Sequence, residues 1–249
     1  MVEGYASDPE AARGISYFCQ ESRDQILRDL NRTFPNEKFF QEAALGFESL
    51  REALECFSKY IPTIGYVQGM NFIVAALIYH SNAEVAFLLF ITLIEEYGLY
   101  EVYMERLPGL DKHCRALERH ISRRLPALYE HFCLYNITVE MFATEWVIGL
   151  FCSVIPLAQI GAFLDGFFEQ RWEFFYKVVV AFLAEIEEDL RQEDELSEIL
   201  NSLKNISRRS DEKDGKFLRK LRKWITLRSD DTSLWLLLIG KAWAMDLND

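Results

Sequence analysis

Two short segments of the sequence carry side chains that could act together on a phosphoryl group. QILRDLNRTFP places Asp29 and Arg32 one helical turn apart, and IGYVQGMNF places Gln68 between Gly65 and Gly69. Phosphoryl transfer to water needs a cation for the charge on the phosphates and an amide that orients the attacking water. An arginine and a glutamine supply both groups without a shifted pKa, which fits a sequence in which no pair of titrating catalytic residues is visible.

The arginine segment is expected at the end of a helix over residues 13–31, because the residue before Pro35 avoids the helical conformation. On this helix Ile26, Asp29 and Arg32 recur every third residue and form a stripe along one side. Asp29 can therefore pair with Arg32 and limit its rotamers. In the alternative interpretation, Arg32 only complements the negative end of the helix dipole, a contribution of about 0.3–1 kcal/mol. The residues alone favour this alternative.

The glutamine segment is a turn that precedes an apolar helix over residues 71–80. A glutamine in such a turn commonly satisfies backbone groups at the start of the next helix. The glycines on either side of Gln68 also allow the backbone to approach another molecule closely. From the residues alone, both interpretations stay open.

The composition predicts a folded helical protein. Half of the 249 residues are apolar and 14% are aromatic, which is a globular composition. Helical periodicity dominates and no alternating strands or Asn-Gly hairpins are visible, so we expect an all-α fold. A net charge of −12 disfavours nucleic acid as a partner. Five dispersed cysteines without a CxxC pair, and a start without a basic and apolar signal, favour the cytoplasm.

Beyond the two segments, periodicity predicts a series of helices. A cap at Ser81 or Asn82 is expected for the apolar helix over residues 83–97. The uncharged run from Trp146 to Leu164 is long enough for a membrane span of roughly 20 residues, but Pro156 in its middle favours two buried helices. The helices are expected at residues 39–59, 71–80, 83–97, 138–152, 156–168, 172–190, 216–227 and 233–245.

Several other kinds of site are disfavoured. The sequence has no P-loop, GxGxxG, GxSxG, HExxH or EF-hand motif. His113 and His120, two turns apart, are too few for a metal site and are expected on a solvated helix face. The acidic run EIEEDLRQEDELSE is also expected to be solvated. The basic helix over 216–227 either touches an anionic membrane surface or packs on the core, and packing is favoured.

The sequence resembles the TBC domain family, whose members are GTPase-activating proteins for Rab-type small GTPases. Ile-x-x-Asp-x-x-Arg-Thr (26–33) is similar to its first motif, and Tyr-Val-Gln-Gly-Met-Asn (66–71) to its second. The likeness continues in order over residues 15–185. It implies a two-lobed helical TBC-type domain with a groove for the GTPase. The expected divisions are a divergent or truncated segment (1–14) and a domain (15–249) with lobes at about 15–135 and 136–249.

The resemblance also implies a mechanism in which two side chains act in trans. Arg32 is the expected arginine finger, which neutralises charge between the β- and γ-phosphates, and Gln68 is expected to orient the water. Supporting or positioning roles are implied for Ile26, Asp29, Thr33, Tyr66, Gly69 and Asn71.

The implied partner is a Rab-type GTPase in its GTP form. GTP and Mg²⁺ would be carried by that partner, and the chain is expected to have no cofactor or metal of its own. Peripheral association with endomembranes, the oligomeric state and the identity of the Rab stay open. The alternative function is that of a TBC-like helical scaffold that binds a GTPase or another partner without catalysis.

Overall fold

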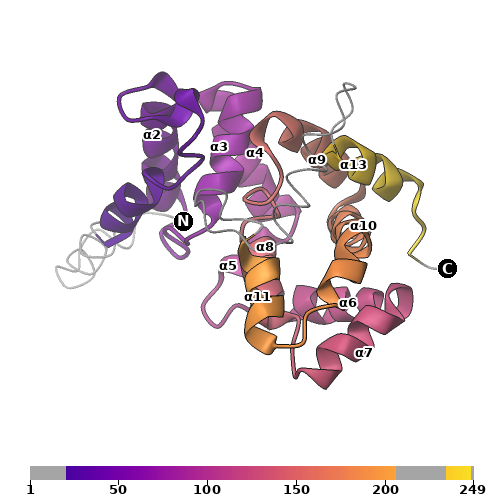
Figure 1. Cartoon of the computed structure of the whole chain (residues 1–249). Helices are drawn as coiled ribbons and strands as arrows, with labels where there is room; N and C mark the ends of the chain where they lie inside the picture. Colours follow the sequence, from indigo (N-terminus) through magenta and orange to yellow (C-terminus); the bar gives the residue numbers. More distant parts are fainter. Residues whose placement is uncertain (1–20, 206–233, 248–249) are drawn as a thin grey trace. The chain divides into compact units, whose positions relative to one another are not determined.

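The computed structural model describes residues 21–205 and 234–247, and the regular elements within these ranges are all helices (Figure 1). This confirms the all-α fold class. The contacts of the chain divide it into two compact units at Gly109/Leu110. The lobe boundary expected near residue 135 falls inside the second of these units.

The first unit is built around an apolar helix, α3. This helix contacts both α2 and α4, and its residues from Met70 to Ile78 are almost all buried. Helices that are apolar on all sides are stable only when surrounded in this way. The helical elements of the unit are residues 21–30, η1 (Lys38–Phe40), α2 (Leu45–Tyr60), α3 (Met70–His80), α4 (Ala83–Glu96) and α5 (Leu99–Tyr103).

The start of α4 follows the local sequence, whereas α2 begins later than expected and the short α5 was not expected. The side chain of Asn82 accepts the backbone N–H of Val85 at 2.9 Å and caps α4, as one of the two expected caps. The helix expected from residue 39 instead begins at Leu45, after the short η1. Ala43, in the intervening turn, has a φ of 66°, which interrupts a right-handed helix.

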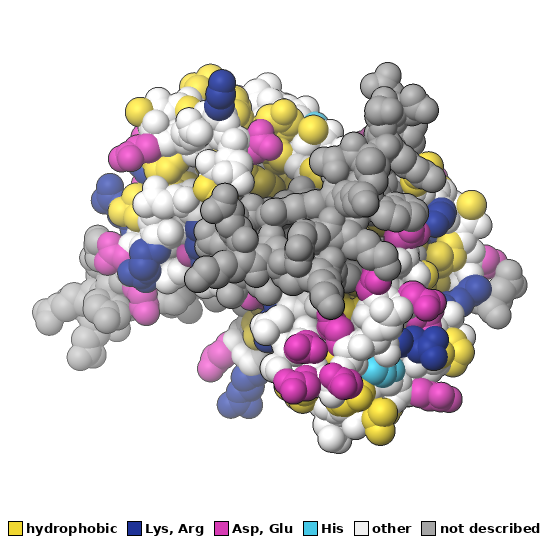
Figure 2. Space-filling model, in the orientation of Figure 1, with side chains coloured by type: hydrophobic (Ala, Val, Ile, Leu, Met, Phe, Trp, Pro, Cys, Tyr) yellow, Lys and Arg dark blue, Asp and Glu magenta, His cyan; other side chains and the backbone are white. Residues whose placement is uncertain are grey.

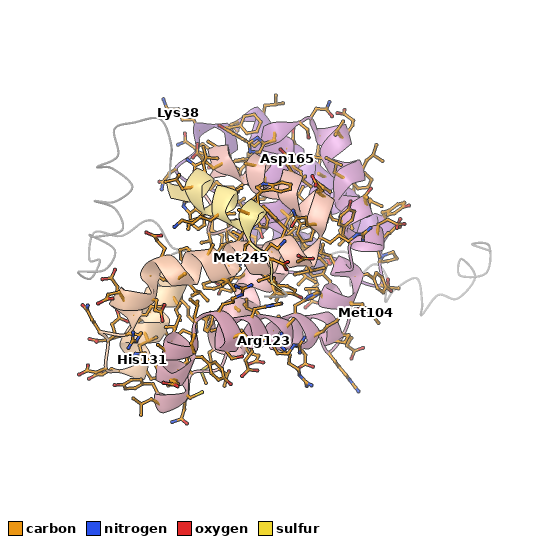
Figure 3. All side chains as sticks on the ribbon, turned by 90° about the vertical axis from the view of Figure 1, so that its right-hand side faces the viewer. Lys38, Met104, Arg123, His131, Asp165 and Met245 are labelled. Atoms are coloured by element: carbon orange, nitrogen blue, oxygen red, sulfur yellow. The ribbon has the colours of Figure 1, made fainter. Side chains whose placement is uncertain are left out.

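The second unit has three helices in mutual contact, α9, α10 and α13. Helix α6 is amphipathic, with Leu117 buried and Arg123 exposed; Figure 3 labels Arg123 on α6 and His131 on α7. Helix α6 begins just before the division between the units. The helices are α6 (Pro108–Arg124), α7 (Pro126–Leu134), α8 (Glu140–Ile148), α9 (Leu157–Gln170), α10 (Trp172–Leu190), α11 (Leu196–Asn205) and α13 (Leu234–Ala244).

The long uncharged run of the sequence forms two helices in this unit. Helix α8 ends at Ile148, earlier than expected, because Leu150 and Phe151 have φ values of 48° and 59°. Pro156 is the N-cap of α9. In the part of the chain that the structure describes, no helix has both the length and the apolar character needed to cross a membrane.

The prediction of a solvated face is wrong for His113. This side chain is 3% exposed. Its ring stacks on Trp172 with centroids 3.5 Å apart, and its Nδ1 lies 2.6 Å from the Tyr176 hydroxyl. Residues 21–205 and 234–247 contain no group of three or more side chains that could hold a metal ion. His113 is therefore a core residue, although the sequence of its helix is largely polar.

The acidic run is mostly exposed over residues 191–198, whereas Glu185, Glu187 and Asp189 on α10 are only partly exposed. Figure 2 shows acidic side chains gathered over α11. Glu193 departs from this pattern, because burial raises the pKa of its carboxyl group above the usual value. The basic helix expected at 216–227, the first part of the expected helix 13–31 and the segment 1–14 lie outside the described residues.

Close packing between α9 and α10 predicts a clear effect of one glycine. A Cβ at Gly166 would overlap the ring of buried Phe174. We expect Gly166→Ala to lower the free energy of unfolding by about 1–3 kcal/mol, as overpacked cores do. Urea unfolding measures the change.

Gly240→Ala on α13 is the matched control. A Cβ there meets no described atom within 4 Å, so alanine should stabilise its helix by about 0.5–1 kcal/mol. Equal effects of the two substitutions would contradict the packing described between α9 and α10.

Candidate functional site

The carboxylate of Asp29 is the centre of a polar cluster in the first unit. Only 2% of its side chain is exposed. Its Oδ1 accepts hydrogen bonds from Arg32 Nε at 2.9 Å and from Gln25 Nε2 at 3.0 Å, and Arg32 Nη2 lies 2.8 Å away. Its Oδ2 accepts the Tyr66 hydroxyl at 2.6 Å. A buried charge is tolerated when it is paired and hydrogen-bonded in this way.

Arg32 lies in the turn that follows the helical residues 21–30. Its backbone N–H donates to the carbonyl of Asp29 at 3.2 Å. The Arg32 side chain is 48% exposed, although its Nε and Nη2 are held by Asp29. The expected pairing with Asp29 is thus present, and the guanidinium is fixed at one edge while much of the side chain faces solvent.

Thr33 and Asn71 connect the arginine turn to the glutamine loop. The Thr33 hydroxyl donates to the backbone carbonyl of Asp29 at 2.7 Å, and Asn71 Nδ2 donates to the Thr33 hydroxyl oxygen at 2.7 Å. Thr33 is 1% exposed and Asn71 is fully buried. Asn71 Oδ1 accepts the backbone N–H of Gly69 at 3.0 Å and lies 3.2 Å from the Tyr66 hydroxyl.

These contacts close a ring, which we call the Asp29 ring. It runs from Asp29 through Tyr66, Asn71 and Thr33 back to the Asp29 carbonyl. The single Tyr66 hydroxyl proton is donated to Asp29 Oδ2 at 2.6 Å, and the contact to Asn71 Oδ1 is the longer one, at 3.2 Å. Two of the bonds in the ring join residues that are far apart in the sequence. The ring therefore fixes the turn that carries Arg32 against the loop that carries Gln68.

Gln68 is exposed at the tip of this loop. The glycines on either side adopt left-handed backbone conformations, with φ of 62° at Gly65 and 115° at Gly69. Residues that have a Cβ rarely adopt such conformations. The backbone N–H at the start of α3 is bonded by Asn71, so the role of satisfying that group falls to Asn71 rather than to Gln68.

The hydroxyl of Tyr66 is a permanent donor in this cluster. Burial raises the pKa of Tyr66 above the usual value of a tyrosine, and the hydrogen bond to Asp29 raises it further. The phenol therefore stays protonated in the physiological pH range and remains a donor.

The structure brings most of the expected site residues together. Ile26 is apart from the polar contacts: it is fully buried and anchors the helix in the core. Gln25 is a contact that the sequence analysis missed. Its spacing of four residues from Asp29 was the available signal, since such pairs face each other on a helix. The hydrogen-bonded set is Gln25, Asp29, Arg32, Thr33, Tyr66, Gly69 and Asn71.

Comparison with known protein families identifies the family of this chain. The model of the Rab-GTPase-TBC domain matches residues 13–191, a range that includes the whole Asp29 ring. The chain belongs to the Rab-GTPase-TBC domain family. The suspected family is thereby confirmed.

Several curated proteins that are similar to this TBC domain have names that refer to GTPase activation. Rab GTPase-activating protein eat-17 of Caenorhabditis elegans is 30% identical over 158 residues, 64% of this chain and 18% of that protein. GTPase-activating protein GYP5 of Saccharomyces cerevisiae is 33% identical over 166 residues, 66% of this chain and 18% of that protein. The chain thus spans about a fifth of the length of these relatives.

Solved structures support the fold of this TBC domain. The Chlamydomonas flagellar RabGAP TBC domain has a TM-score of 0.69 at 22% identity, over 93% of this chain and 72% of that one. The Ypt/Rab-GAP domain of Gyp1p has a TM-score of 0.67 at 19% identity, over 91% of this chain and 73% of that one.

The Asp29 ring predicts a stability effect of a single hydroxyl group. Tyr66→Phe removes a donor from a buried carboxylate, which should lower the free energy of unfolding by about 1–3 kcal/mol. Tyr79→Phe, at a tyrosine that is 39% exposed, is the control and should change it by less than about 0.5 kcal/mol. Denaturant titration of both variants checks this, and a Tyr66→Phe variant as stable as the control would contradict the ring.

Proposed function

We propose that this TBC domain is a GTPase-activating protein for a Rab-type small GTPase, with Arg32 and Gln68 acting in trans on GTP bound to the partner. The observation that carries the proposal is the Asp29 ring, which mounts two exposed side chains of the required types on one buried frame. The names of the curated relatives support the same activity.

The chemistry asked of Arg32 is electrostatic. Hydrolysis of GTP builds negative charge on the oxygens between the β- and γ-phosphates, and a guanidinium placed there stabilises the transition state. Asp29 holds Nε and Nη2 on one side of the planar group. This restricts the long side chain before the partner arrives and lowers the ordering entropy that binding would otherwise cost.

The chemistry asked of Gln68 is orientation of the attacking water. A carboxamide can accept a hydrogen bond from that water through its oxygen and donate one to the γ-phosphate through its nitrogen. Its position at a loop tip, exposed and flanked by glycines with left-handed backbones, allows close approach to a bound nucleotide. In this proposal, the nucleotide and its Mg²⁺ belong to the partner.

Removal of the Arg32 guanidinium should abolish most of the stimulated hydrolysis. Arg32→Ala should lower the stimulated rate of hydrolysis by about 10³–10⁵, the usual contribution of an arginine finger. Arg32→Lys should lose nearly as much, because a compact ammonium cannot hold Asp29 and the phosphates with one planar fork. Single-turnover hydrolysis across a panel of GTP-loaded Rabs measures the rates.

Arg115→Ala is the matched control for Arg32→Ala. Arg115 Nε donates to Asp111 Oδ1 at 2.9 Å, the same distance as in the Arg32–Asp29 pair, but both partners are largely exposed. An exposed pair of this kind contributes about 0–1 kcal/mol. Full stimulation by the Arg32 variants on a Rab that responds to the unmodified chain would refute the assignment.

Removal of the Gln68 carboxamide should also slow the stimulated hydrolysis. Gln68→Ala should reduce the rate at saturating TBC domain by roughly 10²-fold, since the attacking water loses its alignment. Gln41→Ala, another exposed glutamine of the same unit, is the control and should keep the stimulated rate.

A binding assay run beside the hydrolysis assay separates catalysis from scaffolding. If a GTP-loaded Rab binds the unmodified chain tightly and no member of the panel is hydrolysed faster, the chain is a scaffold and the proposal fails. Binding by Gln68→Ala with a lost rate supports the proposal.

A further inference from the structure

We infer that Gln25 is a positioning residue for the arginine finger, acting through Asp29; this rests on the proposed function. Gln25 Nε2 donates to Asp29 Oδ1 at 3.0 Å, the same oxygen that accepts Arg32 Nε. On its other side, Gln25 Oε1 accepts Arg28 Nη2 at 2.7 Å and Arg28 Nε at 3.3 Å. The contacts form a chain from Arg28 through Gln25 and Asp29 to Arg32.

The neighbours of the Gln25 amide determine which way it faces. Arg28 is a cation and can only donate, so it requires the amide oxygen on its side. Asp29, when ionised, can only accept, so it requires the amide nitrogen on its side. A flipped amide would set its oxygen against the carboxylate and its N–H groups against the guanidinium. Both neighbours therefore select the same orientation.

This amide fixes the carboxylate that in turn holds Arg32. The Tyr66 hydroxyl binds Oδ2 at 2.6 Å, and Gln25 binds Oδ1. Two neutral donors, one on each oxygen, define the plane of the carboxylate independently of Arg32. Arg32 then meets an acceptor whose direction is already set, and its guanidinium is aimed before a partner binds.

The position of Gln25 separates this role from a general contribution to stability. The Gln25 side chain is half-buried and Arg28 is exposed. When Gln25 is replaced, Asp29 Oδ1 still accepts Arg32 Nε and lies 2.8 Å from Arg32 Nη2, so that oxygen is not left without a partner. Loss of the Tyr66 hydroxyl, by contrast, removes the donor to Oδ2. Replacement of Gln25 should therefore lower the catalytic rate and weaken the hydrogen bond between Arg32 and Asp29, while the free energy of unfolding changes little.

The test uses two substitutions of similar size at position 25 in the full chain. In single-turnover assays with a responsive Rab, Gln25→Met should lower the rate at saturating TBC domain by about 3- to 10-fold, the net value of one hydrogen bond expressed as a rate. The concentration for half-maximal rate should stay within about twofold, because Gln25 acts on the finger rather than on association. Gln25→Glu should lose at least as much, since a second carboxylate beside Asp29 cannot donate when ionised.

Two further variants place the effect on the chain of contacts. Arg28→Met should produce a smaller loss in the same direction, because the amide loses the neighbour that fixes its oxygen. Gln41→Met, the same change at an exposed glutamine beyond η1, should keep the rate of the unmodified chain.

A readout that needs no partner distinguishes this inference from the proposed function. The NMR signal of the Arg32 Nε–H reports its hydrogen bond to Asp29, and it should shift and broaden in Gln25→Met but not in Gln41→Met. If no Rab responds to the unmodified chain while this signal changes as expected, the proposed function fails and the positioning of Arg32 stands. If a Rab responds and Gln25→Met keeps both the rate and the signal, the inference about Gln25 is overturned.

Discussion

A carboxylate that loses its water must receive hydrogen bonds from the protein, and Asp29 is such a group. With 2% of its side chain exposed, an unpaired charge there would cost several kcal/mol. Its bonding partners come from its own helix, from the following turn and from the loop before α3. Satisfying this one group therefore draws three pieces of chain into a fixed arrangement.

In this arrangement, buried groups hold the structure together and exposed groups are available to a partner. Thr33, Tyr66 and Asn71 are bonded to one another or to Asp29 and carry the frame, while Arg32 and Gln68 stand at its solvent side. A guanidinium and a carboxamide need no pKa adjustment for the proposed chemistry. What they need is a fixed direction, and a connected network of hydrogen bonds fixes it better than a single pair.

The local part of this site could be predicted from the sequence, and the long-range part could not. Spacing along one helix predicted that Asp29 and Arg32 pair, and they do. The bond from Tyr66 to Asp29 joins residues 37 positions apart, so it depends on how the loop packs against the helix, which no periodicity encodes. The TBC resemblance grouped these residues by motif without giving their contacts.

The differences between the expected and the observed fold have the same physical origin. Helix α8 ends before the expected residue because Leu150 and Phe151 adopt left-handed conformations, and apolar residues give no sequence warning of such a turn. His113 was expected on a solvated face, but Trp172 and Tyr176 from α10 provide it with a stacking ring and a hydroxyl. In both cases tertiary packing overrode the local pattern.

The central claim is that one frame aims both side chains at a single nucleotide on the partner. It is tested most directly by a crystal structure of the chain bound to a responsive Rab loaded with GDP and aluminium fluoride, which mimics the γ-phosphate in transfer. In that complex, the Arg32 guanidinium should lie within hydrogen-bond distance of the β-phosphate and the mimic. The Gln68 amide should bind the attacking water, and the Asp29–Tyr66 hydrogen bond should remain intact. A complex in which either side chain lies away from the nucleotide would contradict it.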